Sequence, residues 1–411
     1  MGQIGIDSIY IKNSCFRTKT KAVWYNNEVR YCFFCTRKNI VEMENSMEKK
    51  RFMVVSGFLG AGKTTTMVAL TEYINSTGKS AAIIANDLGA NYIIDAEYSG
   101  RQNVEVTPIG GNCICYIPDT LIERIERLNK QNPRDIVMSD IPGCGIGALD
   151  HVYGNLDKNH KDEFTLAPFT VVTDPERLRM IMPEKADIHL PEELKFLLAA
   201  QLKEADCVVL NKIDLMTDEE VDRYVKFLEE ACPGIPVFAI SAKEKKGLEP
   251  LVDYLLSAES RVNITDIGYG GPEFISAEKT MSWFNRNVFI TSKDGSEFDG
   301  NRLVDDLIDE IRDGLIANKR NVPHLKTFAV GKDQDYAKFS LIGVDYDIIH
   351  DQELQEKTDK LRLVVNARAV CESDLLLDIV DDAFDAIADK YDVKIKLFFN
   401  ECFGMMDEGR N

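Results

Sequence analysis

Residues 54–65 read Val-Val-Ser-Gly-Phe-Leu-Gly-Ala-Gly-Lys-Thr-Thr, an apolar strand that runs directly into a glycine-rich turn and then a helical run. The turn has the spacing G-x-x-x-x-G-K-[ST], in which backbone N–H groups surround phosphates, Lys63 reaches the outer phosphates and the Thr64 hydroxyl holds Mg²⁺. The predicted phosphate-binding residues are Gly57, Gly60, Ala61, Gly62, Lys63, Thr64 and Thr65. The stretch therefore predicts a nucleoside triphosphate site that follows the first strand of a sheet.

Two further motifs indicate which base is bound. Residues 205–210 are apolar on both faces and end in Asn211-Lys212-Ile213-Asp214. The Asp214 carboxylate can accept from the ring N–H and the exocyclic amine of guanine, a donor pair that adenine lacks on that edge. The strand predicted at 235–240 ends in Ser241-Ala242-Lys243, the loop that backs the guanine in GTPases. Doubly wound sheets place ligands at the carboxyl ends of their strands, so both motifs predict guanine binding.

An Asp-x-x-Gly motif follows the apolar strand predicted at 136–140. Asp140 is placed to order the Mg²⁺ shell through water, and the Gly143 N–H can contact the γ-phosphate and report its loss. Residues from Gly143 to about Asp150 are therefore a candidate switch. Hydrolysis should need Lys63, Thr64 and Asp140, because phosphoryl transfer depends on positioning and charge neutralisation.

Strand and helix patterns alternate through the first half of the chain. Strands are predicted at 52–56, 81–86, 104–108, 136–140, 169–173, 208–211 and 237–241, and amphipathic helices at 120–128, 192–205, 219–231 and 248–256. This alternation predicts an α/β fold with a doubly wound, mostly parallel sheet. Later the order becomes β-α-β-β-β-α-β, which predicts a smaller α+β domain of split βαβ type.

The predicted domains follow from these patterns. They are an extension at 1–46, a P-loop GTPase domain at 47–258, a Gly- and Pro-containing linker at 259–280, the α+β domain at 281–400 and a tail at 401–411. The extension is basic on balance, and Met47 resembles a natural start, which favours a disordered or artefactual segment. A small metal knuckle is the alternative, because Cys32 and Cys35 have the Cys-x-x-Cys spacing and Cys15 could complete the site.

The composition limits the class of protein. A chain of 411 residues, 45% of them hydrophobic, can fill the cores of two domains. Its net charge of −19 argues against nucleic acid and anionic membranes as general partners. The sequence has no bilayer-spanning apolar run and no signal peptide, so we expect a cytoplasmic protein. Its ten cysteines are then expected to be thiols or metal ligands.

Cys113-Ile114-Cys115 places two thiols on one side of an extended segment. Two thiolates cannot complete a tetrahedral site, and Cys144, directly after Gly143, is the candidate third ligand. A soft metal such as Zn²⁺ or Co²⁺ on these three cysteines would connect a thiolate site to the γ-phosphate sensor. The alternative is that Cys113 and Cys115 are small buried hydrophobic residues. His151 and His160, in a polar loop, are expected to be solvated rather than ligands.

Over about residues 50–258 the chain resembles the CobW/HypB/UreG family of SIMIBI-class GTPases, its CobW branch most of all. The motifs that carry the resemblance are Gly-Phe-Leu-Gly-Ala-Gly-Lys-Thr-Thr at 57–65, Ile-Ala-Asn-Asp-Leu-Gly at 84–89 with Asp95 behind it, and Gly-Asn-Cys-Ile-Cys at 111–115. The resemblance implies a metal- or cofactor-delivery GTPase that forms a nucleotide-dependent homodimer and hydrolyses GTP slowly until a partner or dimer formation stimulates it. It also implies that Asp87 orients the attacking water, with Asp95 as second candidate.

The expected ligands are GTP and Mg²⁺, and the expected partner is a client metalloenzyme. Two other functions stay open: a chaperone or reactivator of a corrinoid-dependent enzyme, and a GTP-regulated binding module with negligible turnover. A small-molecule kinase is disfavoured, because the motifs at 211–214 and 241–243 select a base and no basic cluster for an acceptor is evident.

Overall fold

The computed structural model describes residues 21–25, 28–32, 49–89, 94–143, 145–182 and 192–404, and the chain divides into two compact units, 1–49 and 50–411. In the first unit, β1 (Lys21–Tyr25) and β2 (Glu28–Cys32) form an antiparallel hairpin. These two strands are not predicted from the sequence, although valine, tryptophan and tyrosine favour them. The proposed metal knuckle is not tested, because Cys15 and Cys35 lie outside the described residues.

The second unit starts with an eight-stranded sheet in which every pairing is parallel. In spatial order the strands are β10 (Val237–Ala239), β9 (Cys207–Leu210), β8 (Thr170–Thr173), β3 (Lys50–Ser56), β6 (Ile136–Asp140), β4 (Ala81–Asp87) and β5 (Val106–Gly110), with β7 (Phe164–Leu166) also paired to β3. After β6 the chain crosses to the other side of β3, so β3 lies where the winding reverses. Ligands bind at such a reversal. The predicted doubly wound fold is confirmed; β7 was not predicted.

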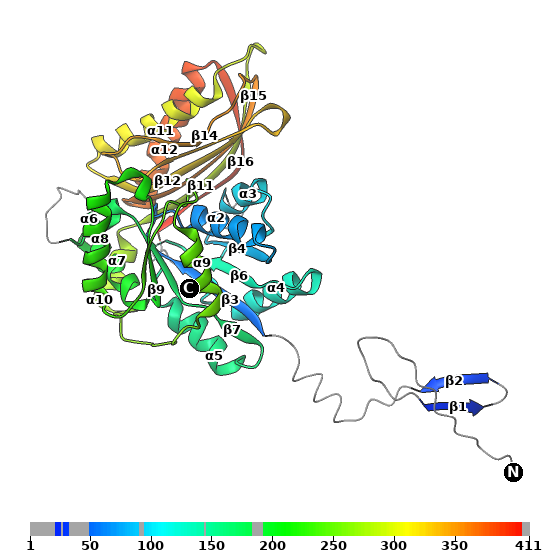
Figure 1. Cartoon of the computed structure of the whole chain (residues 1–411). Coiled ribbons are helices and arrows are strands. Elements are labelled where there is room, and N and C mark those ends of the chain that lie inside the picture. Colours follow the sequence, from blue (N-terminus) through cyan, green and yellow to red (C-terminus); the bar gives the residue numbers. More distant parts are fainter. Residues whose placement is uncertain are drawn as a thin grey trace. The chain divides into compact units, whose positions relative to one another are not determined.

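Helices cover both faces of this sheet (Figure 1). They are α2 (Lys63–Ser76), α3 (Ile94–Arg101), α4 (Pro118–Gln131), α5 (Asn155–Asn159), α6 (Pro175–Arg179), α7 (Glu192–Glu204), α8 (Asp218–Ala231) and α9 (Leu248–Ser257), with a π-helical turn at Leu149–Gly154. Successive β3 residues point to opposite faces. Phe52 and Val54 join the core beneath α4 and α8, whereas Met53 and Val55 join the core beneath α2 and α9.

The C-terminal part is an antiparallel sheet with two helices on one face (Figure 1). Its elements are β11 (Ser282–Ser292), α11 (Gly300–Ala317), β12 (Asn321–Val330), β13 (Tyr336–Leu341), β14 (Ile349–Gln352), β15 (Lys360–Val370), α12 (Ser373–Lys390) and β16 (Val393–Gly404). The strand order is β14-β13-β12-β15-β11-β16. The crossovers β11-α11-β12 and β15-α12-β16 interleave, which is the split βαβ arrangement that the sequence predicted.

Three details of the predicted organisation were wrong. The segment 259–280, predicted as a linker, contains α10 (Pro272–Lys279), which packs on α7. Strand β14 was missed because Ile349-His350-Asp351-Gln352 is short and mostly polar. Strand β16 extends into the predicted tail, because residues 401–404 continue to pair with β11. In the described part of the chain, no helix is both long and apolar enough to cross a bilayer.

A third core joins the C-terminal sheet to the phosphate loop. Phe58 and Leu59 of that loop pack in one cluster with Trp283 of β11 and Phe403 of β16, together with α7 and α10. All four side chains are at most 8% exposed. The C-terminal sheet therefore lies directly against the turn that the sequence assigns to phosphate.

Candidate nucleotide site

The turn between β3 and α2 has a backbone that only glycine adopts readily. Gly57, Gly60 and Gly62 have φ values of 136°, 79° and 93°. A Cβ at Gly57 would lie 2.0 Å from the Val172 carbonyl oxygen, so the backbone approaches too closely for any side chain. Lys63 Nζ donates to the Gly57 carbonyl at 2.7 Å and to Phe58 at 3.3 Å. The turn leads into the amino end of α2, whose N–H groups suit a phosphate.

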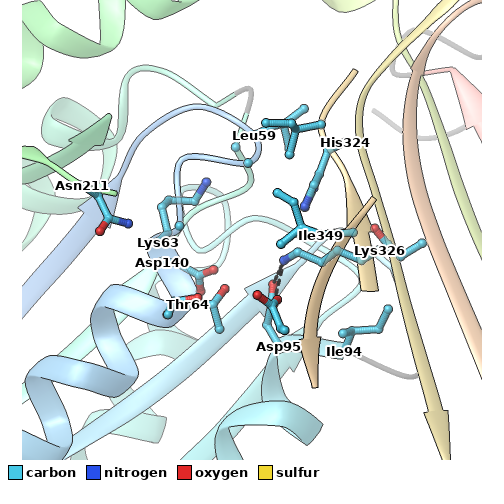
Figure 2. Close-up of a pocket in the computed structure, with 18 of the residues that line it drawn as sticks. Leu59, Lys63, Thr64, Ile94, Asp95, Asp140, Asn211, His324, Lys326 and Ile349 are labelled. Carbon is cyan, nitrogen blue, oxygen red and sulfur yellow. Dashed lines mark hydrogen bonds and ion pairs between the residues drawn. The ribbon is translucent and has the colours of Figure 1, made fainter. Parts of the chain in front are cut away.

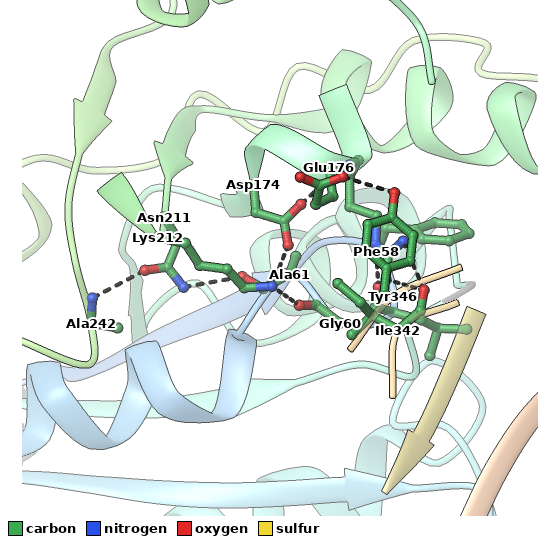
Figure 3. A network of polar contacts seen from close by, with 12 residues as sticks. Phe58, Gly60, Ala61, Asp174, Glu176, Asn211, Lys212, Ala242, Ile342 and Tyr346 are labelled. Carbon is green, nitrogen blue, oxygen red and sulfur yellow. Dashed lines mark hydrogen bonds and ion pairs between the residues drawn. The ribbon is translucent and has the colours of Figure 1, made fainter. Parts of the chain in front are cut away.

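Asn211 and Lys212, which belong to the first base-selecting motif, form hydrogen bonds with this turn, and Asn211 also bonds Ala242 of the second motif (Figure 3). Asn211 Nδ2 donates to the Ala61 carbonyl at 3.0 Å, and Asn211 Oδ1 accepts from the Ala242 N–H at 3.0 Å. Lys212 Nζ donates to the Gly60 carbonyl at 2.7 Å and to Asp174 at 2.6 Å. Burial acts to raise the pKa of Asp174, but nearby Lys212 and Arg177 outweigh it and keep that pKa below its usual value.

Asp214 has a carboxylate oxygen suited to the role predicted for it. It lies in a 3₁₀ turn at Ile213–Leu215 and lines the same cavity as Lys63 and Thr64. Its Oδ1 is buried, with no hydrogen-bond partner among the described residues. Because an unsatisfied buried acceptor costs free energy, a ligand with two N–H donors would stabilise this corner. Guanine has that pair of donors.

A cavity of about 260 Å³ brings most of the predicted nucleotide-binding residues together. Those that line it are Gly60, Gly62, Lys63, Thr64, Thr65, Asp87, Asp140, Gly143, Asn211, Lys212, Asp214, Ala242 and Lys243. Gly57 and Ala61 shape the turn behind it, and Ser241 Oγ accepts from the Glu244 N–H at 3.1 Å. Cys113 and Cys115 do not line the cavity.

Thr64, Asp95 and Asp140 supply the oxygen atoms that a divalent cation would need (Figure 2). Burial, reinforced by the charge of Asp95, raises the pKa of Asp140 to about 7, while the Asn86 N–H donates to Asp140 Oδ1 at 2.8 Å. Asp95 accepts a hydrogen bond from the Thr64 hydroxyl. Oxygen ligands of this kind fit Mg²⁺, which would stabilise two neighbouring buried carboxylates in their charged form.

Asp87, assigned by resemblance to orient water, has a partner that the sequence did not suggest. Its Oδ1 lies 3.0 Å from Arg368 Nη2 and accepts from the Gly89 N–H at 3.1 Å. Arg368 belongs to β15 and lies over the ring of Trp283. Sequence reasoning missed it, because an arginine in a strand carries no local signal of a contact so distant along the chain.

The candidate switch is held by two side chains of α7 that the sequence analysis also missed. Gln201 Nε2 donates to the carbonyls of Gly143 and Gly145, both at 3.0 Å. Glu204 accepts from the N–H groups of Gly147 at 2.9 Å and Leu149 at 3.0 Å. Burial raises the pKa of Glu204 to about 7 despite those two hydrogen bonds.

One residue, Asn86, connects the segment that carries the cysteine pair to Asp140 by hydrogen bonds. Asn86, 5% exposed, donates from Nδ2 to the Asn112 carbonyl at 2.7 Å and accepts from the Ile114 N–H at 3.1 Å, while its own N–H binds Asp140. A hydrogen bond from Cys115 lowers the pKa of Cys113, which favours a thiolate there. The third predicted ligand, Cys144, lies outside the described residues.

The two histidines near the switch each have an aromatic or acidic neighbour. The His151 ring meets the Tyr269 ring edge-on at 4.6 Å between centroids, and His160 Nδ1 lies 2.9 Å from Glu163. Both side chains are half-buried, so each keeps part of its surface exposed beside these contacts. Within residues 49–404, apart from the masked gaps, no group of three His, Cys, Asp or Glu side chains could hold a metal.

A family model described as the CobW/HypB/UreG nucleotide-binding domain matches residues 51–239. The chain matches this model over 189 of its 411 residues. It is 27% identical over 190 residues to zinc-regulated GTPase metalloprotein activator 1 of Schizosaccharomyces pombe, a match that covers 44% of this chain and 43% of that protein. It is 26% identical over 245 residues to a GPN-loop GTPase of Pyrococcus abyssi, covering 52% of this chain and 93% of that one.

Solved structures are also similar to parts of this chain. The crystal structure of HypB from Helicobacter pylori in complex with nickel has 18% identity and a TM-score of 0.37, and covers 54% of this chain and 94% of HypB. The crystal structure of Zn(II)-bound YjiA GTPase from E. coli has 12% identity and a TM-score of 0.31, and covers 83% of this chain and 99% of YjiA.

Proposed function

We propose that this chain binds and hydrolyses GTP with Mg²⁺ and acts as a metallochaperone or metallocofactor-insertion protein of the CobW type. The observation that carries the proposal is the corner formed by Asn211, Ala242 and Asp214, where the base-selecting motifs are hydrogen-bonded to the phosphate loop and one Asp214 oxygen is buried without a partner among the described residues. The match of residues 51–239 to the CobW/HypB/UreG nucleotide-binding domain supports it.

Each residue of the site is assigned to a part of the nucleotide, to Mg²⁺ or to the attacking water. Lys63 Nζ is assigned to the outer phosphates, and Asp214 to the guanine edge. The Thr64 hydroxyl and Asp140 are assigned to Mg²⁺, which neutralises charge on the phosphates. Asp87 is assigned to the attacking water, as the resemblance implies. Binding and orientation by these residues suffice for slow hydrolysis, and we propose that a nucleotide-dependent homodimer or a client metalloenzyme stimulates it.

The metal role is proposed from Cys113 and Cys115. The relative in S. pombe carries the name zinc-regulated GTPase metalloprotein activator, which supports a soft metal at this thiol pair. Asn86 bonds both Asp140 and the segment that carries Cys113, so nucleotide and metal could affect each other through it. Six cysteines in the described part of the chain form no disulfide there, which supports a reducing compartment such as the cytoplasm.

Cobalt(II) titration tests the thiol pair. We expect thiolate-to-metal absorption with the wild type, and its loss in Cys113→Ser and in Cys115→Ser, because cobalt(II) binds thiolates and reports them optically. Cys402→Ser is the matched control, since Cys402 is half-buried like Cys115 but donates to the Ser373 carbonyl and does not line the nucleotide cavity. Titrations with GDP and with a non-hydrolysable GTP analogue should give different affinities. Equal affinities would contradict the coupling.

Hydrolysis assays test the role assigned to Asp87. Asp87→Ala should retain GTP affinity within a few fold and lose hydrolysis by roughly 10²-fold, the scale of a lost general-base or water-positioning contact. The comparison variant is Arg368→Ala, which removes the partner of Asp87 but not its carboxylate. If Arg368→Ala loses as much hydrolysis as Asp87→Ala, then Asp87 acts only through its contact with β15. If Asp87→Ala hydrolyses GTP at the normal rate, Asp87 has no role in turnover.

One observation favours a second candidate, a chaperone of a corrinoid-dependent enzyme. Such a chaperone needs the nucleotide switch but no metal of its own, and the described residues, which do not include Cys144, contain no three-ligand metal group. Stimulation of GTP hydrolysis by a corrinoid enzyme, in a protein that shows no thiolate absorption with cobalt(II), would favour this candidate over metal delivery. Hydrolysis that stays negligible with every partner and metal would leave the GTP-regulated binding module.

A further inference from the structure

The C-terminal domain forms one wall of the nucleotide cavity. His324 and Lys326 of β12 and Arg368 of β15 line the cavity together with Lys63, Thr64 and Asp140. Figure 2 shows the side chains of His324 and Lys326 extending from β12 toward Lys63 and Asp95. The space in front of the phosphate loop is therefore bounded by both domains, and cations project into it from both sides.

Lys326 lies close to the position predicted for Mg²⁺ and the terminal phosphate. Its Nζ is 2.7 Å from Asp95 Oδ1 and 2.9 Å from Oδ2, and each of the two side chains is 16% exposed. Asp95 also accepts a hydrogen bond from Thr64, so one carboxylate separates the Lys326 ammonium from the phosphate loop. An ammonium has three donors, of which Asp95 takes two.

The charges on this wall favour an anion. Burial and four nearby cations, Lys326, Lys63, Arg368 and Arg177, all act to keep His324 neutral and hold its pKa well below the usual value. The space beside His324 thus lies in a region of positive potential. A phosphate there would be stabilised by the same cations that disfavour a second positive charge on the imidazole.

We propose that Lys326, with His324 beside it, is the second half of the terminal-phosphate site, supplied by the C-terminal domain of the same chain. With GTP bound, Lys326 donates to the γ-phosphate; with GDP bound, it donates only to Asp95. The C-terminal domain thereby distinguishes the two nucleotides directly. This inference rests on the proposed GTP binding and adds a residue that discriminates GTP from GDP.

Equilibrium titration of the full chain at fixed Mg²⁺ tests the inference. Lys326→Ala should weaken binding of a non-hydrolysable GTP analogue by roughly 10- to 100-fold, the range of a hydrogen bond between charged groups. GDP affinity should change less than about threefold, because GDP lacks the group that Lys326 contacts, and retained GDP binding also shows that the variant is folded. Lys394→Ala, which removes an exposed lysine of β16 in the same sheet, should change neither affinity.

A second pair of variants separates phosphate binding from neutralisation of Asp95. If Lys326 contacts the phosphate, Lys326→Ala should weaken GTP-analogue binding by a similar factor in the Asp95→Asn background as in the wild type. If Lys326 only neutralises Asp95, the substitution will have no effect in that background, and the inference is overturned.

The remaining outcomes of these titrations also test the role assigned to Lys326. Equal loss of GDP and GTP-analogue affinity in Lys326→Ala would mean that the wall is structural, and a gain of GTP-analogue affinity would mean that Lys326 competes with the ligand for Asp95. Either result overturns this inference while the proposed GTP binding stands. If the wild type binds neither guanine nucleotide, the proposed function itself fails, and this inference fails with it.

Discussion

Asp214→Asn should change the base that the protein prefers, from guanine to xanthine. The substitution replaces an acceptor by a donor at the oxygen that is buried without a partner among the described residues. Two charge-assisted hydrogen bonds to guanine are lost, so GTP and GDP affinity should both fall by roughly 10²- to 10⁴-fold. Xanthine carries an acceptor where guanine carries the exocyclic amine, so affinity for xanthosine triphosphate should rise. Competition titrations with GTP, xanthosine triphosphate and ATP measure all three.

Asp218→Asn is the matched control for this experiment. This substitution removes the same charge four residues away, where Asp218 lies on the exposed first turn of α8. It should leave the preference for guanine unchanged. Equal affinity of the wild type for ATP and GTP would remove the assignment of Asp214. Lost GTP binding without any gain for xanthine would show that Asp214 supports the turn at 213–215 rather than reading the base.

Arg177→Ala should lower the free energy of unfolding by about 3–5 kcal/mol, the cost of breaking a buried charged contact. The Arg177 side chain, on α6, is 1% exposed and joins both domains. Nε donates to the Leu59 carbonyl at 2.7 Å, and Nη2 donates to the carbonyls of Pro323 at 3.1 Å and Ile342 at 3.3 Å. The alanine variant leaves these buried acceptors unpaired. Urea unfolding followed by circular dichroism measures the loss.

Arg179→Ala is the control for Arg177. It lies two residues along the same helix, has a side chain that is 43% exposed, and pairs with Glu176, so its removal should cost less than about 1 kcal/mol. Arg177→Lys should recover only part of the stability, because lysine cannot donate in three directions from a planar group. A stability of Arg177→Ala within about 1 kcal/mol of the wild type would show that the two domains do not depend on this contact.

The sequence predicted which residues of the parallel sheet lie together at one edge, because their motifs follow strands. Lys63, Asp140 and Asp214 each follow or end a strand of one parallel sheet, so the fold alone brings them to one edge. Lys326 and Arg368 follow no such rule. Each is a charged residue inside an antiparallel strand, and its role depends on how the second domain lies against α3 and β4, which no local pattern encodes.

Helix α10 shows how a correct local signal led to a wrong conclusion. Gly271-Pro272 was interpreted as part of a linker, because both residues interrupt regular structure. Proline is, however, favoured in the first turn of a helix, where its missing N–H is not needed, and α10 begins at Pro272. Burial of Ala277 against α7 then decides the conformation, and that tertiary contact is invisible in the composition of the segment.

The contacts of α7 with residues 143–149 have a mechanical consequence. Gln201 and Glu204 lie three positions apart on one helix face and bind the segment at both ends. A displacement of the bonded residues, Gly143, Gly145, Gly147 and Leu149, would either break these hydrogen bonds or carry the helix with it. Since α7 packs on α10, and α10 leads into β11, a shift of the helix would change the angle between the domains. If Gly143 contacts the γ-phosphate as we propose, loss of that contact would reach the C-terminal sheet through α7 and α10.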